Sequence, residues 1–180
     1  MNETIRILST QFQLQEISKE EFIDRLPIDL KTNPLKLKEL FLLTMDARNS
    51  EGLESALTVM WALGMEHEQV DLLNRLLLEP WHTRHEDIIH EIQRQKNPDS
   101  IPYIREAMQK RYGYLVEYGT GVRQFINQCG HALVSIGTRE ALEVVYDLSS
   151  SQDPVLQDEM LYRISRIEGT RYDRNDELED

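Results

Sequence analysis

The chain has 180 residues, with 20 Lys and Arg against 32 Asp and Glu, a net charge of −12 and one cysteine. This length is enough for one domain with a real core, while a lone Cys129 excludes an intramolecular disulfide framework and a thiolate metal cluster. The strong negative charge argues against direct binding to nucleic-acid phosphates. The sequence has no apolar run of ~20 residues and no signal peptide, which predicts a cytoplasmic protein with no membrane partner.

The first part of the chain predicts a capping element. Residues 3–17 and 19–26 form a short amphipathic helix pair, and Ser18 and Glu21 have the spacing of a capping box. We expect residues 1–34 to cover the first of the elements that follow. The apolar residues available for this are Ile5, Leu8, Phe12, Phe22 and Leu26.

Two apolar stripes at helical spacing then alternate along the chain. The first stripe, spaced i, i+3, i+7, lies at Leu40/Leu43/Ala47, Val70/Leu73/Leu77, Ile101/Ile104/Met108 and Ala141/Val144/Leu148. The second, spaced i, i+1, i+4, lies at Ala56/Leu57/Met60, Ile88/Ile89/Ile92, Ala132/Leu133/Ile136 and Met160/Leu161/Ile164. The strict alternation predicts four helix pairs, and because no strand pattern of useful length is present, the chain is predicted to be all-α.

Helix ends are marked by capping residues. Asn33, Asn97 and Asp153 each precede a proline at an expected first helical position, and Gly64, Gly137 and Gly169 lie where helices should stop.

The four pairs recur at a regular distance. First-stripe starts are 30, 31 and 40 residues apart, and the longest step contains an insertion of about 13 residues in the third pair. Amphipathic hairpins of this length cannot bury their apolar faces alone and therefore stack. The prediction is a short right-handed α-solenoid forming a single domain over residues 1–171. Residues 172–180, with five acids against one Arg174, are predicted to be an acidic flexible tail.

Several segments carry a family resemblance. Residues 60–64 (MWALG) and 132–142 (ALVSIGTREAL) resemble the helix-to-helix junctions of HEAT repeats, and residues 152–155 (QDPV) resemble the turn within such a repeat. Together with residues 80–87, residues 35–168 resemble small bacterial HEAT-repeat proteins, some of which are regarded as immunity proteins that neutralise a toxin. The resemblance implies HEAT-like helical hairpins and a partner that is a protein. The regular Asp/Arg ladder of such repeats is missing here.

Metal binding and nucleophilic catalysis are each weighed against a structural role. His82, His85 and Glu86 follow neither zinc-protease order, and Thr83 with Glu86 is better explained as a capping box, with Trp81 packing at the turn. Cys129 and His131 point in different directions on a helix, so Cys129 is interpreted as a buried small hydrophobe. We therefore predict no catalytic, cofactor-binding or metal-binding residue.

The inserted segment, residues 111–121, combines three tyrosines with three glycines. Tyr112, Tyr114 and Tyr118 offer the large amphipathic contact surface that is typical of protein-binding loops. The alternative is a helix extension whose tyrosines pack on the third repeat, and both interpretations stay open.

Acidic residues concentrate in one part of the chain. Residues 46–91 contain ten acids and three bases, whereas residues 94–111 contain five bases and two acids. The resemblance implies that the second helix of each pair lines a concave side, where stacked repeats would align carboxylates into an acidic groove that steers a basic partner. The alternative is that these acids only keep the surface soluble. The predicted groove residues are Glu51, Glu54, Glu86, Asp87, Glu91, Asp158 and Glu159.

These features predict a non-enzymatic protein-binding protein. The resemblance suggests immunity against a basic toxin domain such as a nuclease, blocked by covering its active site. The alternatives are a HEAT-like enzyme, either a tetrapyrrole lyase with His82, His85, Tyr112 or Cys129 in a deep pocket or a nucleic-acid-directed activity, and a generic adaptor scaffold.

Overall fold

The structure, a computed structural model, describes residues 3–117 and 121–175, and this part of the chain contains twelve α-helices, two short 3₁₀ helices and no strand. The prediction of an all-α protein is therefore confirmed. The chain divides into two compact units, residues 1–72 and 73–180, and each unit is described by itself. The boundary falls within α6 (Val70–Leu76), and the prediction of a single domain over residues 1–171 stays a prediction.

The first unit is built around α5 (Ser50–Leu63), which contacts α1 (Glu3–Gln13), α2 (Lys19–Arg25) and α4 (Pro34–Asp46). A short α3 (Ile28–Thr32) packs on α4, and the 3₁₀ helix η1 (His67–Gln69) precedes α6. α5 is buried on more than one side, because Leu53, Leu57 and Met60 on one side and Val59 on another are all fully buried. The rings of Phe12 and Phe22 stack with centroids 4.8 Å apart, which joins the ends of α1 and α2. The predicted N-terminal helix pair is thus present.

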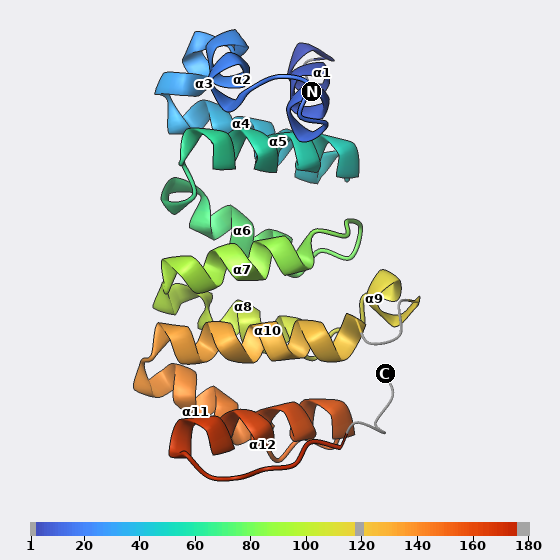
Figure 1. The fold of residues 1–180 in the computed structure, drawn as a ribbon, viewed down its shortest axis with the longest axis vertical. Helices are drawn as coiled ribbons and strands as arrows, with labels where there is room; N and C mark the ends of the chain where they lie inside the picture. The colour runs from blue at the N-terminus through green and yellow to red at the C-terminus, as the bar shows by residue number, and fades with distance from the viewer. Residues whose placement is uncertain (1–2, 118–120, 176–180) are drawn as a thin grey trace. The chain divides into compact units, whose positions relative to one another are not determined.

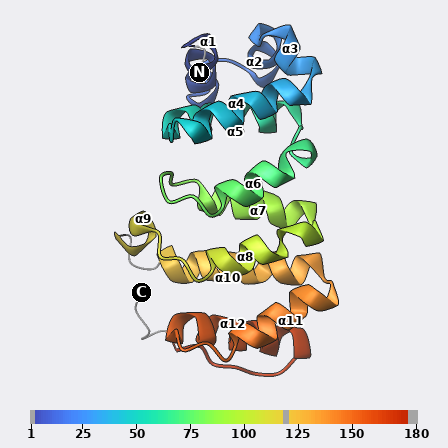
Figure 2. The ribbon, with the colours of Figure 1, turned by 180° about the vertical axis from the view of Figure 1, so that it is seen from behind.

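The second unit has two layers of helices. α10 (Gly121–Ile136) lies between α7 (His85–Gln95) and α12 (Pro154–Glu168), and α8 (Ile101–Ala107) and α11 (Arg139–Leu148) lie behind these three (Figures 1 and 2). The 3₁₀ helix η2 (Pro98–Ser100) leads into α8, and a short α9 (Gly113–Glu117) precedes α10. Side chains from both layers form the core. Its fully buried members include Ile89, Ile92, Leu133, Val145 and Met160.

The eight helices predicted from the apolar stripes all occur, in the predicted order: α4, α5, α6, α7, α8, α10, α11 and α12. Many end signals are also confirmed. The Ser18–Glu21 capping box forms, the side chains of Asn33, Asn97 and Asp153 cap helices whose first residue is proline, and the three predicted stop glycines adopt φ values between +69° and +71°. That backbone region is strained for residues with a Cβ, which explains the glycines.

The predicted capping box at Thr83 and Glu86 is wrong. α7 begins at His85, and Arg84 at the N-cap makes no side-chain cap. Instead, the backbone N–H of Arg84 donates to Nδ1 of His82 at 3.1 Å, and the Glu86 carboxylate accepts hydrogen bonds from α10. Glu86 therefore binds a side chain of another helix and does not cap its own helix.

The cap of α12 gives a direct test of these local rules. Oδ1 of Asp153 accepts hydrogen bonds from the backbone N–H groups of Val155 and Leu156, and its Oδ2 pairs with Arg111. Replacing Asp153 by Ala should lower the free energy of unfolding by about 1 kcal/mol, because the first turn loses its acceptor. Asp153→Asn keeps the cap and loses only the ion pair, so it should cost less. Urea unfolding followed by circular dichroism measures both variants, and equal losses would contradict this assignment of the cap.

Candidate functional site

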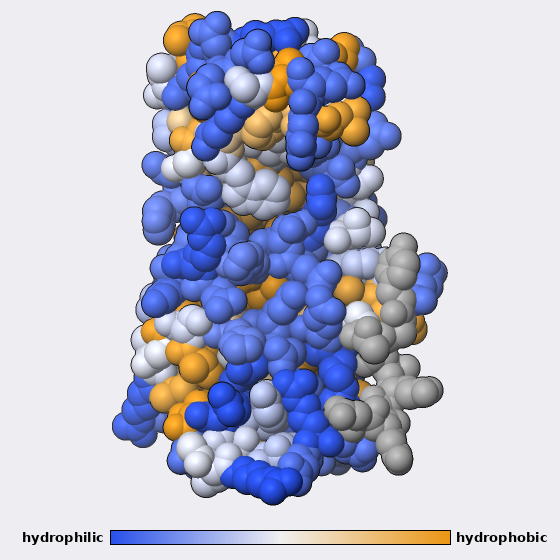
Figure 3. All heavy atoms as spheres, viewed as in Figure 1, coloured by the Kyte–Doolittle hydropathy of each residue, from blue (hydrophilic) through white to orange (hydrophobic). Residues whose placement is uncertain are grey.

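α10 is polar where it faces α7 and α12, and two of the predicted site residues, Glu86 and Glu159, bind its side chains. Hydrophilic residues predominate on the face where α7 and α10 lie (Figure 3). Toward α7, Nε2 of Gln124 and Nε2 of Gln128 both donate to Oε1 of Glu86, at 2.9 and 3.2 Å. Further along the same helix pair, Gln93 donates to Ser135 at 3.2 Å. Both amide side chains of α10 therefore bind the same carboxylate oxygen of Glu86, Oε1.

Toward α12, α10 is joined by a buried ion-pair cluster. Nη1 of Arg123 donates to Oδ2 of Asp158 at 2.9 Å and to Oε1 of Glu159 at 2.8 Å, and Asn127 donates to the other oxygen of Glu159 at 2.7 Å. The Glu159 side chain is fully buried and that of Arg123 is 15% exposed. Because a buried charge without a partner is costly, this cluster fixes the register between α10 and α12.

The C-terminal segment Tyr172–Asn175 packs on this cluster. Oδ1 of Asp158 accepts hydrogen bonds from the Tyr172 hydroxyl at 2.9 Å and from the backbone N–H of Asn175 at 3.2 Å. The Arg174 guanidinium lies 3.7 Å from the ring centroid of Tyr162 and 3.5 Å from Glu159. Although burial raises the pKa of Asp158, the hydrogen bonds from Arg123, Asn175 and Tyr172 outweigh it and leave the pKa lowered. Residues 172–175, predicted to begin a flexible tail, are thus held in place. Residues 176–180 lie outside the described residues.

A second cluster, of stacked histidine and tyrosine rings, holds the insertion. The ring centroids of His82 and His85 are 4.2 Å apart, and Tyr112 covers the other face of His85 at 3.7 Å. Nε2 of His85 contacts the carbonyl oxygen of Glu79 at 2.9 Å, so it carries the proton, and Nδ1 accepts from the Tyr114 hydroxyl at 3.0 Å. The Tyr112 hydroxyl donates to the carbonyl oxygen of Leu77 at 2.6 Å. The insertion is therefore tied to the loop before α7.

Both histidines of this cluster are held in the neutral form. Burial, together with the neighbouring His82 and Lys110, lowers the pKa of His85 to about 3, and burial also lowers the pKa of His82. The pKa of Tyr114 is raised, first by burial and then by the nearby carboxylates of Glu86 and Asp87. In this cluster Nε2 of each histidine contacts a backbone carbonyl oxygen, that of Leu76 for His82 and that of Glu79 for His85.

An acidic cavity opens beside this cluster, where α7, α9 and α10 meet. It measures about 390 Å³ and is lined by Thr83, Glu86, Tyr114, Leu115, Glu117, Gly121 and Gln124. Two of these residues are carboxylates and none is a lysine or arginine. α9 and α10 approach so closely here that a Cβ at position 121 would lie 2.6 Å from the carbonyl oxygen of Leu115, so this position requires glycine. The cavity can therefore accept a cationic or hydrogen-bond-donating group.

A neighbouring cavity of about 360 Å³ has the opposite character. It is lined by Arg123, Gln124, Asn127, Gln128 and Arg174. Nε of Arg174 and Oε1 of Gln128 are buried and have no hydrogen-bond partner in the structure. Gln124 lines both cavities, so the acidic and the basic cavity are adjacent.

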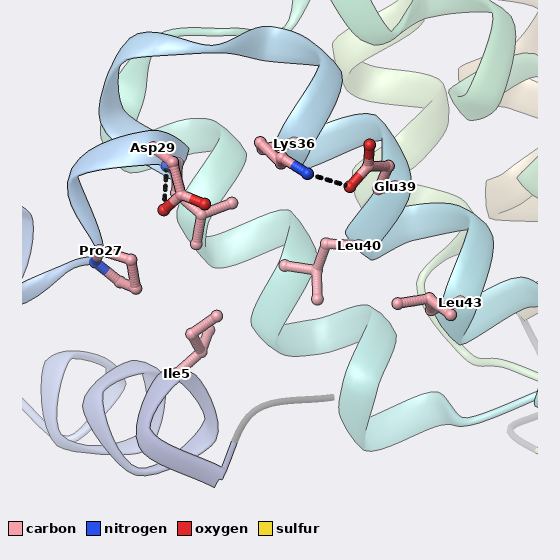
Figure 4. Close-up of a pocket in the computed structure, with 8 residues that line it drawn as sticks. Ile5, Pro27, Asp29, Lys36, Glu39, Leu40 and Leu43 are labelled. Carbon is pink, nitrogen blue, oxygen red and sulfur yellow. Dashed lines mark hydrogen bonds and ion pairs between the residues drawn. The ribbon is translucent and has the colours of Figure 1, made fainter.

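The first unit contains a different kind of cavity. About 390 Å³ in volume, it lies between α1, α3 and α4, with Ile5, Leu40 and Leu43 pointing into it and the Lys36–Glu39 ion pair at its edge (Figure 4). None of the predicted site residues lines it.

The structure brings together only some of the predicted site residues. Glu86 and Tyr114 line the acidic cavity and Asp87 is exposed beside Arg84, with which it pairs at 3.1 Å. Glu51 and Glu54 belong to α5 of the first unit, where Glu51 is exposed and 4.0 Å from Arg6. Tyr118 lies outside the described residues.

Four predicted residues are in the interior. Glu91 is 5% exposed and pairs with Arg94, Tyr112 is 2% exposed, and Asp158 and Glu159 are enclosed by Arg123. The prediction that their side chains face a partner is corrected, because their polar atoms bind other parts of the chain. Tyr112 packs against His85 and Phe125 and lies just before α9, so it is not part of a helix extension.

Sequence reasoning missed Glu117, Arg123, Gln124, Gln128 and Arg174. Glu117 is the one carboxylate in the inserted segment, which was a usable signal. Arg123, Gln124 and Gln128 carried none, because their partners lie 35 to 42 residues away in the sequence. Arg174 carried none either, because its role depends on the buried Glu159 of α12.

Cys129 is completely buried, which raises the pKa of its thiol. Among residues 3–117 and 121–175, there is no cluster of three or more histidine, cysteine or acidic side chains that could bind a metal ion. Within the same ranges, no helix has both the length and the apolar character that a membrane span requires.

Comparison of the chain with protein-family models, with curated proteins and with solved structures returns no match.

The buried histidines predict a stability that falls on acidification. The pKa of His85 is about 3 in the folded chain and about 6.5 in the unfolded chain. The contribution of the neutral His85 to the free energy of unfolding is therefore complete above pH 6.5 and is lost progressively as the pH falls toward 3. Between pH 7 and pH 5 the free energy of unfolding should drop by about 2 kcal/mol more in the wild type than in His85→Gln. Urea unfolding at the two pH values measures this difference. The matched control is His67→Gln, at an exposed position; an equal drop in His85→Gln and wild type would contradict the neutral, buried state of His85.

The ion-pair cluster predicts a strong contrast between two glutamates. Glu159→Ala should lower the free energy of unfolding by about 3 kcal/mol, because Arg123 and Arg174 lose a buried partner. Glu143→Ala, which removes an exposed pair with Arg139 on α11, should have little effect. Similar losses in the two variants would show that the cluster does not hold α10 and α12 together.

Proposed function

We propose that the chain is a non-enzymatic protein-binding protein and that the acidic cavity between α7, α9 and α10 is its main contact site. The observation that carries this proposal is the composition of the cavity wall, which contains Glu86 and Glu117 and, among the described residues that line it, no basic side chain. Such a wall favours the lysine or arginine side chain of a partner, because charge-assisted hydrogen bonds to a carboxylate are the stronger kind. Tyr114 supplies an amphipathic contact surface beside the carboxylates.

The proposed architecture is a short, right-handed α-solenoid of HEAT-like hairpins. Support comes from the succession of paired helices, and from the second unit, where the second helices α7, α10 and α12 form one layer. In such an arrangement side chains that are distant in the sequence contribute to a continuous recognition surface.

The proposed partner is a basic toxin domain, and the proposed role is immunity, exerted in the cytoplasm by covering the toxin's active site. The resemblance to small bacterial HEAT-repeat proteins suggests this role. A nuclease uses lysine and arginine to bind phosphates, and Glu86 and Glu117 would pair with such side chains and block them. An excess of negative charge on the whole chain would speed the encounter with a basic domain.

The enzymatic alternative has weaker support. A lyase-like site needs His82, His85, Tyr112 or Cys129 in a deep pocket, but these four side chains are buried and none is among the residues that line the two cavities around α10. The three that are polar donate to backbone carbonyl oxygens. A generic adaptor would use the same surface and differ only in its partner.

A co-purification experiment tests the proposed site. The tagged wild-type chain, expressed in its native cells, should retain a protein with a basic surface, identified by mass spectrometry. Retention should fall at least tenfold in the double variant Glu86→Gln, Glu117→Gln, since two interfacial charge pairs worth roughly 1 kcal/mol or more each are lost. The matched control is Glu140→Gln, at an exposed position of α11, which should retain the partner. Equal retention by all three proteins would contradict the site, and retention of no protein would contradict the function.

A further inference from the structure

A short segment of the chain lies on α12 as a strap. After Gly169 ends α12, the chain turns back along this helix (Figure 1). The strap, residues 172–175, has no regular secondary structure and contacts Asp158, Glu159 and Tyr162 of α12. It therefore occupies the surface of α12 in the way that an extended peptide ligand would.

The strap is bound partly through its backbone. The backbone N–H of Asn175 donates to Oδ1 of Asp158 at 3.2 Å, and the carbonyl oxygen of Asn175 accepts from Nη2 of Arg123 at 3.1 Å. The Tyr172 hydroxyl donates to the same Oδ1 at 2.9 Å. In peptide-binding sites such main-chain hydrogen bonds give affinity and the side-chain contacts give specificity. The chemistry under the strap is therefore suited to a polypeptide.

The strap also balances the charge of the surface beneath it. Asp158 and Glu159 are both buried, and among the described residues their ion-pair partners are Arg123 of α10 and Arg174 of the strap. The Arg174 guanidinium also lies 3.7 Å from the ring centroid of Tyr162. Without the strap, the two carboxylates would share the guanidinium of Arg123. This surface would then favour a segment that brings its own cation.

The fit of the strap is incomplete. Nη1 of Arg174 lies 3.5 Å from Oε1 of Glu159, whereas a close charge-assisted hydrogen bond measures about 2.7–2.9 Å. Nε of Arg174 is closed off from solvent and has no hydrogen-bond partner in the structure, which is costly. Beside the strap, Arg174 also lines the cavity of about 360 Å³. Another occupant could therefore make better contacts than the strap does.

The strap is anchored by polar contacts alone. None of residues 169–175, all of which the structure describes, is a buried residue. A segment that buries little apolar surface opens at a low cost in free energy. The strap can therefore leave its site while the helices beneath it stay folded.

We infer that the strap covers a second binding site of this chain, and that an extended segment of a partner protein with the same chemistry takes its place. That segment carries a tyrosine two residues before an arginine, as Tyr172 and Arg174 do. Its hydroxyl would bind Asp158, and its guanidinium would lie on Tyr162 and pair with Glu159. The site lies outside the acidic cavity, so the inference goes beyond the proposed function and does not depend on it.

Capped peptides test this site on the full chain. Tyr-Asp-Arg-Asn repeats the strap, whereas Phe-Asp-Arg-Asn lacks the hydroxyl and Tyr-Asp-Gln-Asn lacks the guanidinium. They are titrated into the isotope-labelled Tyr172→Phe, Arg174→Gln double variant, whose own strap has lost these two groups, and binding is followed by NMR. Tyr-Asp-Arg-Asn should bind about three- to fivefold more tightly than either other peptide, the increment of one partly exposed polar contact. It should shift the backbone signals of Arg123, Asp158 and Tyr162.

The wild-type chain shows whether the strap competes with the peptide. A strap that is closed about nine-tenths of the time lowers the apparent affinity of a peptide about tenfold. Tyr-Asp-Arg-Asn should therefore bind the wild type about tenfold more weakly than the double variant. The matched control is Arg171→Gln, because the Arg171 guanidinium pairs with Asp173 of the same segment. This variant should bind the peptide as weakly as the wild type does.

Equal affinity of the double variant for the three peptides, or shifts confined to other helices, would overturn the inference. Should the double variant fail to fold, the same comparison is made on the wild type at higher peptide concentration. Equal affinity of the wild type and a folded double variant would show that the strap does not cover the site. Sedimentation velocity tests the remaining occupant: a wild-type dimer that becomes monomeric in the double variant would assign the site to the strap of a second copy and contradict a partner segment.

Discussion

The buried Glu159 carboxylate is the constraint on which the polar face of the second unit depends. A fully buried charge must be paired, and Arg123, Asn127 and Arg174 reach it from α10 and from the C-terminal segment. Once these groups are in place, α10 and α12 have a single register and the two arginines stand at the wall of a cavity. The same interaction therefore holds α10, from which Gln124 and Gln128 bind Glu86, against α12.

The histidine–tyrosine cluster has a comparable role at the other cavity. His85 is stacked between His82 and Tyr112 and accepts a hydrogen bond from Tyr114, which fixes the start of α9 against α7. Gly121 then allows the backbone of α10 to approach Leu115. The ring cluster around His85 and the close approach at Gly121 therefore hold the two cavity walls that carry Glu86 and Glu117. A site whose walls are held in place loses little conformational entropy when a partner binds.

The helices could be predicted from the sequence because the residues that determine where a helix forms and ends lie within or next to that helix. Apolar stripes, prolines after capping residues and stop glycines lie within each helix, and they gave the eight paired helices in order. The site was only partly predictable. Glu86 and Tyr114, which line the acidic cavity, are among the predicted residues. Asp158 and Glu159 look like exposed acids in the sequence, and their burial follows from Arg123, 35 and 36 residues earlier. Likewise, the anchoring of residues 172–175 depends on Asp158 and not on their own composition.

The most direct test of the account is an experimental structure of the full chain bound to the protein that it retains. The account predicts a lysine or arginine nitrogen of the partner within about 4 Å of a carboxylate oxygen of Glu86 or Glu117. A partner bound elsewhere on the chain, with no basic group in the cavity between α7, α9 and α10, would contradict it.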